Sequence, residues 1–132
     1  MKRNGVLNAE IMKTVAEMGH TDQLTIADAG LPIPPGVARI DLALVDNIPS
    51  FIEVLTAVSK ELALEKVYIA RELPAQNPRV YAALCQVLAG IECEMVPHVQ
   101  LKEMSASSKA VIRSGECSPF ANVILQSGVT FA

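Results

Sequence analysis

Short apolar runs alternate with amphipathic segments along almost the whole chain, and this alternation restricts the fold more than any other feature. Apolar residues spaced by three and four predict helices, whereas compact apolar runs predict buried strands. Helices that alternate with strands are typical of α/β domains, in which a helix connects two parallel strands. We therefore expect an α/β fold with helices flanking a mostly parallel sheet.

The bounds of these elements follow from the apolar spacing and from the Gly and Pro residues between them. We expect strands at 24–27, 39–44, 67–70, 91–95, 109–113 and 121–126, and helices at 9–18, 49–62, 78–88 and 99–106. Pro49 and Pro78 are expected in the first turns of their helices, with Asn77 as a cap. Three prolines between residues 31 and 36 predict a loop.

The connection before the last predicted strand, residues 114–120, is too short to contain a crossover helix. The last strand should therefore run antiparallel to its neighbours. At 132 residues, with no linker or repeat, the chain is expected to form one domain over residues 1–132. The predicted architecture is a single-domain, mixed, mostly parallel six-stranded sheet.

Charge and hydropathy exclude several kinds of partner. The net charge of −3 is spread evenly, which argues against a nucleic acid and an anionic membrane surface. No apolar stretch approaches the roughly 18 residues of a membrane span, and the first residues do not resemble a signal peptide. Hydrophobic residues make up 51% of the chain, more than a domain this small is expected to bury alone. We therefore expect a homo-oligomer.

The three cysteines, Cys85, Cys93 and Cys117, are odd in number and lack the spacing of a zinc site. Reduced thiols in a cytoplasm fit this pattern. Phosphate-binding glycine loops and nucleophile elbows are also missing, so we expect no cofactor and no metal.

Polar side chains are predicted to collect at one edge of the sheet. Asp28 ends the first strand, His98 follows the fourth, and Asn122 lies near the start of the antiparallel last strand. Ligands of α/β proteins bind beyond the carboxyl ends of strands, so these three residues are candidates for a polyol site. Asp28 also suits a purely turn-capping role, and a lone histidine such as His20 or His98 is often structural.

Seven sequence blocks, in chain order from about Asn8 to Phe131, resemble the ribose pyranase and fucose mutarotase family. They are Gly19-His20-Thr21-Asp22, Asp28-Ala29-Gly30-Leu31-Pro32-Ile33-Pro34, Arg39-Ile40-Asp41, Pro49-Ser50-Phe51, Ile112-Arg113-Ser114-Gly115-Glu116, Pro119-Phe120-Ala121-Asn122 and Gly128-Val129-Thr130-Phe131. The resemblance implies a cofactor-free cytoplasmic sugar mutarotase that interconverts ribopyranose and ribofuranose. It also implies a ring-shaped oligomer, commonly a decamer of two pentamers, with sites between subunits.

The same resemblance implies roles for individual residues. His20 corresponds to the family's proton donor. Six further residues correspond to residues that bind the sugar in this family: Asp28, His98, Lys102, Phe120, Ala121 and Asn122. The family pattern usually has a tyrosine where this chain has Phe120, so a phenolic hydroxyl is missing from the expected pocket.

Ring interconversion requires one group to take the anomeric proton and another to protonate the ring oxygen. Histidine suits both steps because its ordinary pKa of roughly 6.5 lies near neutrality. The sequence leaves the base open between Asp28 and His98. It also leaves two alternative functions open: anomer exchange of L-fucose, and a non-enzymatic sugar-binding accessory of ribose uptake.

Overall fold

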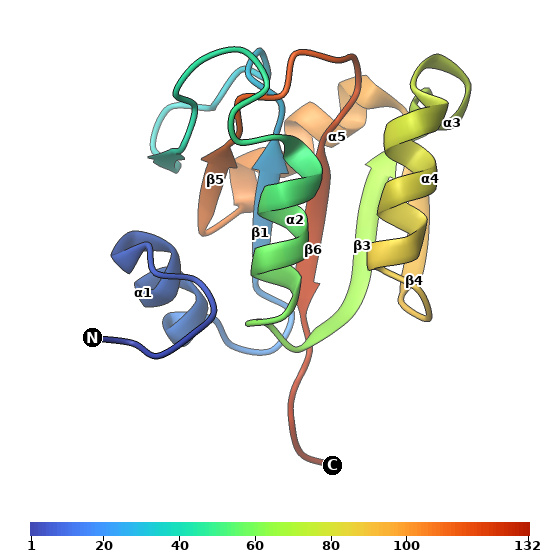
Figure 1. Cartoon of the computed structure of the whole chain (residues 1–132). Helices are drawn as coiled ribbons and strands as arrows, with labels where there is room; N and C mark the ends of the chain where they lie inside the picture. The colour runs from blue at the N-terminus through green and yellow to red at the C-terminus, as the bar shows by residue number, and fades with distance from the viewer.

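The computed structural model describes all 132 residues, and its six strands form one sheet in the order β2-β5-β1-β6-β3-β4 (Figure 1). The strands are β1 Gln23–Ala27, β2 Ala38–Asp41, β3 Leu64–Ala70, β4 Glu92–Val96, β5 Ala110–Arg113 and β6 Val123–Ser127. The helices are α1 Ala9–Glu17, α2 Phe51–Ser59, α3 Leu73–Gln76, α4 Pro78–Val87 and α5 His98–Met104, followed by the 3-10 turn η1 Ser105–Ser107.

Strand β6 is the only antiparallel strand, as the short connection before it predicts. It pairs antiparallel with both β1 and β3, whereas β1 with β5, β2 with β5, and β3 with β4 are all parallel pairs. At the centre of the sheet, Val123 of β6 lies opposite Ile26 of β1 and Ile69 of β3. The α/β fold with a mixed, mostly parallel six-stranded sheet is therefore confirmed.

Helices cover both faces of the sheet. In Figure 1, α2 and α4 lie in front of the strands and α5 lies behind them. The front face carries the main core, in which Phe51 and Leu55 of α2 pack with strand residues such as Ile26 and Leu125. A smaller cluster on the other face joins Leu101 of α5 to the sheet. Because both faces are covered, the central strands are buried almost throughout.

Several predicted bounds were wrong, for local reasons. Helix α2 begins at Phe51, not at Pro49, because Ser50 accepts a hydrogen bond from Glu53 N–H and forms a capping box with it. Asn77 precedes α4, but its side chain makes no cap and instead donates to Ser118 and Pro119. Helix α3 was not predicted, since four residues are too few to show a period.

The strand bounds also differ from the predicted ranges. Strands β1, β4 and β5 are displaced by one residue at one or both ends, and β3 begins at Leu64, before the predicted residue 67. Strand β2 ends at Asp41, before the predicted residue 44, because the chain then turns into an exposed loop. Strand β6 begins at Val123, so Asn122 lies just before the strand. After β6 the chain extends away from the sheet, and the side chains of Val129 and Phe131 are exposed (Figure 1).

The loop after β5 approaches the loop before α2 so closely that a side chain at Gly115 has no room. A Cβ atom there would lie 2.6 Å from Ile48 O and 2.8 Å from both Ile48 N and Val45 O. All three are backbone atoms, so they cannot move aside as a flexible side chain would. We expect Gly115→Ala to lower the free energy of unfolding by about 1–3 kcal/mol, measured by urea denaturation.

Gly36→Ala is the matched control, because Gly36 has a φ of +85° and no atom within 4 Å of the added Cβ. Its expected cost of about 1–2 kcal/mol comes from the left-handed backbone alone. Unchanged stability of Gly115→Ala would show that the two loops separate more easily than this packing implies.

Candidate functional site

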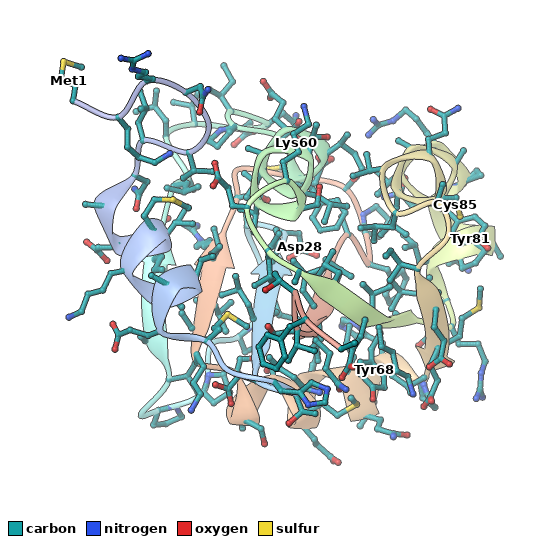
Figure 2. The ribbon with its side chains drawn as sticks, turned by 90° about the horizontal axis from the view of Figure 1, so that it is seen from below. Met1, Asp28, Lys60, Tyr68, Tyr81 and Cys85 are labelled. Atoms are coloured by element: carbon teal, nitrogen blue, oxygen red, sulfur yellow. The ribbon has the colours of Figure 1, made fainter.

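Asp28 lies at the carboxyl edge of the sheet, directly after β1, and its carboxylate is held on both sides. Gly30 N–H donates to Oδ1 at 2.9 Å, and the Asn122 amide donates from Nδ2 to Oδ2 at 3.1 Å. The carbonyl oxygen of the same amide accepts from Asp28 N–H at 2.8 Å. Viewed from below in Figure 2, Asp28 lies near the centre of the molecule, far from Met1 and Tyr81. Asp28 is thus a positioned carboxylate as well as a turn residue.

Burial and hydrogen bonding have opposite effects on the Asp28 carboxyl. Partial burial raises its pKa above the ordinary 3.8, because desolvation disfavours the charged form. The hydrogen bonds from Gly30 and Asn122 and the charge of His98 act in the lowering direction without cancelling the effect of burial. The balance leaves a proton acceptor that is more basic than an exposed aspartate.

His98 begins α5 and faces the same edge of the sheet. Its backbone N–H donates to both carboxylate oxygens of Glu72, at 3.1 and 3.2 Å, which anchors the free amino end of this helix. The imidazole packs edge-on against Phe120, with ring centroids 5.0 Å apart and an interplanar angle of 85°. Its Nδ1 atom is buried without a hydrogen-bond partner.

The residues from Phe120 to Asn122 form the other wall of this edge. Phe120 has a φ of 59°, in the left-handed region, and Asn122 N–H donates to its carbonyl at 2.9 Å. Asn122 is fully buried, and so is Ala121, whose side chain belongs to the main core. Ala121 can therefore face a ligand only through its backbone. Lys102 lies one turn after His98 on α5 and is exposed.

The structure places His20 at the opposite edge of the sheet. His20 precedes β1, whereas Asp28 follows it, and five strand residues at about 3.3 Å each separate the two ends. The His20 side chain is 55% exposed, and its Nε2 atom lies 3.0 Å from Glu65 Oε2. A single chain thus brings together Asp28, His98, Phe120 and Asn122, but it does not bring His20 to them.

Sequence reasoning missed Glu116, which holds the loop that carries Phe120. Its carboxylate is 3% exposed, accepts from Phe51 N–H at 3.0 Å, and accepts from the Ser118 hydroxyl at 2.6 Å. Asn77 extends this network by donating to Ser118 Oγ and to Pro119 O. No local pattern signals this network, because Glu116 reaches Phe51 across 65 residues of sequence and Asn77 reaches Ser118 across 41.

No group of three or more His, Cys, Asp or Glu side chains is arranged to hold a metal ion. None of the helices combines the length and the apolar character needed to cross a bilayer.

The structure is an α/β protein in which a carboxylate, an imidazole and an amide meet beyond the carboxyl ends of strands, where α/β proteins commonly bind ligands. The chain belongs to the RbsD / FucU transport protein family, whose model matches residues 1–130. It is 49% identical over 132 residues to a D-ribose pyranase of Geobacillus thermodenitrificans, covering 100% of both chains. It is also 49% identical over 131 residues to a D-ribose pyranase of Laribacter hongkongensis, covering 99% of this chain and 100% of that one.

Solved structures agree with this assignment. Bacillus subtilis RbsD complexed with D-ribose superposes with a TM-score of 0.96 at 44% identity, covering 99% of this chain and 100% of that one. FucU from Bifidobacterium longum has a TM-score of 0.82 at 23% identity, covering 95% and 96% of the two chains, and so supports the fold alone.

The raised pKa of Asp28 predicts a pH-dependent contribution to stability. A folded pKa above the unfolded 3.8 means that the folded state binds this proton more readily. The contribution is therefore fully present below the unfolded pKa and is lost as the pH rises through the folded pKa. We expect the stability difference between wild type and Asp28→Ala to be larger at about pH 4 than at about pH 7.

Urea unfolding of both proteins at the two pH values measures this difference. Comparing wild type with the variant removes the effect of titrating groups that do not interact with Asp28. A difference that is equal at both pH values, or larger near neutrality, would contradict the direction of the Asp28 shift.

Proposed function

We propose that this chain is a D-ribose pyranase, an isomerase that interconverts the pyranose and furanose forms of D-ribose by general acid/base ring opening and closing. The observation that carries the proposal is the group formed by Asp28, His98, Phe120 and Asn122. It occurs in a chain that is 49% identical over its full length to proteins named D-ribose pyranase. The 44% identical RbsD structure in complex with D-ribose supports the same sugar.

The proposed chemistry uses only proton transfers. To open the pyranose, a base takes the proton of the anomeric hydroxyl while His20 protonates the ring oxygen and the C–O bond breaks. The open-chain aldehyde then recloses through a different hydroxyl, whose proton returns to the protein as the carbonyl oxygen regains one. Positioned acid and base groups contribute about 10²–10⁴-fold each to such reactions. We draw the base from Asp28 and His98.

The sugar-binding roles follow from the geometry of each side chain. Asn122 holds the Asp28 carboxylate in place and is itself buried, so the pair presents a fixed acceptor to sugar hydroxyls. The Phe120 ring offers an apolar wall for a sugar face, and Lys102 adds a flexible donor one helical turn from His98. The wall needs only the aromatic ring, so the missing phenolic hydroxyl at Phe120 is compatible with this role.

The separation of His20 from Asp28 supports a site shared by two subunits. In this arrangement His20 of one subunit lies against the carboxyl edge of the sheet of another. Exposed apolar side chains lie at both ends of the sheet that such a contact would join. Leu44, Val45 and Ile48 follow the carboxyl end of β2. Val129 and Phe131 follow β6, near the end that carries His20. We propose a ring-shaped homo-oligomer, a decamer of two pentameric rings, which native mass spectrometry would count.

We also place the protein in the cytoplasm, with no cofactor and no metal. All three cysteines are free thiols, which fits a reducing compartment. Proton transfer by His20 and its partners suffices for the reaction.

Pyranose–furanose exchange of D-ribose, measured by saturation-transfer NMR with catalytic amounts of protein, tests the activity. We expect wild type to accelerate exchange and His20→Ala to lose at least about tenfold of that rate, given the usual size of acid–base effects. The variant should stay folded, because His20 is exposed and packs in no core cluster.

The same spectra recorded with L-fucose distinguish ring interconversion of D-ribose from anomer exchange of L-fucose. A folded wild-type protein that binds ribose without accelerating exchange would support a binding accessory and contradict the enzyme.

Subunit complementation tests the shared site. We expect His20→Ala and Asp28→Ala each to lose most activity alone, and an oligomer reassembled from equal amounts of both to regain part of it. Random assembly gives about a quarter of the sites an intact histidine and an intact aspartate from different subunits. Both substitutions combined in one chain, mixed with wild type, serve as the matched control. A mixture of single variants that gains no activity after verified subunit exchange would place both residues of a site in one subunit.

A further inference from the structure

Glu65 is the only side-chain hydrogen-bond partner of His20, and it lies outside the group formed by Asp28, His98, Phe120 and Asn122. Its Oε2 atom lies 3.0 Å from His20 Nε2. The two side chains are 35% and 55% exposed, so their ion pair contributes little to folding stability. A contact of this kind has more effect on the orientation of the imidazole than on the stability of the protein.

A β-bulge directs Glu65 toward this contact. In the pairing of β3 with β6, Leu64 lies opposite Ser127 and Lys66 lies opposite Gln126, so Glu65 is an extra residue without a partner. Bulges change the direction of a side chain relative to regular strand alternation, and they are frequent next to active sites. The irregularity therefore occurs at the residue that contacts His20.

The second oxygen of Glu65 is held as well. Gln126 donates from Nε2 to Glu65 Oε1 at 2.9 Å, and Gln23 in turn donates to Gln126 Oε1 at 3.1 Å. The hydrogen bond from Gln126 and the contact with His20 lower the pKa of Glu65, so the carboxylate is ionised at neutral pH. The chain Gln23–Gln126–Glu65 fixes the position of the oxygen that faces His20.

The backbone that carries His20 is anchored to the same end of β6. Thr21 N–H donates to Ser127 O at 2.8 Å, and Ser127 N–H donates to Asp22 O at 2.8 Å. Thr21 has a φ of 71°, a conformation that a β-branched residue rarely adopts. Strain of this kind persists where surrounding bonds determine the backbone, and it concentrates at functional sites. Both the backbone and the ring of His20 are thus held by residues at one end of β6 and β3.

We infer that Glu65 is the positioning residue for proton transfer by His20, an inference that rests on the role proposed for His20 above. Glu65 Oε2 accepts the Nε2–H proton of the ring, so Nδ1 is the atom that exchanges a proton with the sugar. During ring opening the Nδ1 proton moves to the ring oxygen as the C–O bond breaks, while the Nε2 proton stays on the bond to Glu65. Reclosure returns a proton to Nδ1.

Exchange kinetics of Glu65→Ala test this role. We expect kcat for ribose to fall by about tenfold or more, a part of the usual contribution of about 10²–10⁴-fold from a positioned acid, while KM changes by no more than about twofold. In the His20→Ala background, Glu65→Ala should cause no further loss, because Glu65 acts only through His20. Glu65→Asp should recover part of the rate, since it keeps the carboxylate.

Glu94→Ala is the matched control, because Glu94 is another exposed strand glutamate, paired with Lys66 and not with His20. It should leave kcat unchanged. Equal losses from Glu65→Ala and Glu94→Ala, or a full additional loss in the His20→Ala background, would overturn the positioning role.

A measurement without sugar separates this inference from the proposed function. The ring ¹⁵N chemical shifts of neutral His20 report which nitrogen carries the proton. We expect the proton on Nε2 in wild type, where Glu65 accepts it, and a mixture of the two tautomers in Glu65→Ala. The same tautomer in both proteins overturns the inference whatever the activity. A changed tautomer in a protein that never accelerates exchange shows that Glu65 holds His20 and that the proposed function is wrong.

Discussion

The antiparallel pairing of β6 with both β1 and β3 joins two parallel halves of the sheet, and the rest of the molecule depends on it. Because β6 runs opposite to its neighbours, its start lies beside the carboxyl end of β1 and its end lies beside the amino end. Asn122, just before β6, therefore reaches Asp28. At the other end, Gln126 reaches Glu65, the partner of His20. One strand thus organises both groups of polar residues.

Two carboxylates near the carboxyl edge of the sheet have different roles. Burial raises the pKa of Asp28, whereas the buried Glu116 has a structural role. Asp28 keeps a raised pKa because burial outweighs the hydrogen bonds from Gly30 and Asn122. Glu116 is more deeply buried, but it caps the first turn of α2 through Phe51 N–H and holds Ser118. Its hydrogen bonds fix the loop that ends in Phe120. The position of Phe120 at the carboxyl edge therefore depends on a buried residue, Glu116, that lies outside the group formed by Asp28, His98 and Asn122.

Much of the fold follows from local spacing, and so could be predicted. Helical periodicity located α1, α2, α4 and α5, and the short connection before β6 correctly predicted an antiparallel strand. The errors at Pro49 and Asn77 occur where a side-chain contact overrides a local preference. Ser50 and Glu53 cap α2 after Pro49, so the proline lies outside the helix. Asn77 stands before α4 as expected, yet its amide is used by the loop that carries Ser118.

The sequence by itself determined the α/β class, the antiparallel direction of the last strand, and the candidate residues for a site. It could do so because periodicity, turn residues and motif spacing are local properties of the chain. Only the tertiary structure decided how those residues are grouped. It joined Asp28 to Asn122 across 94 residues of sequence, placed His20 at the other end of β1, and introduced Glu65 through a β-bulge. Such groupings depend on strand order and register, which arise from packing between segments that are distant in the sequence.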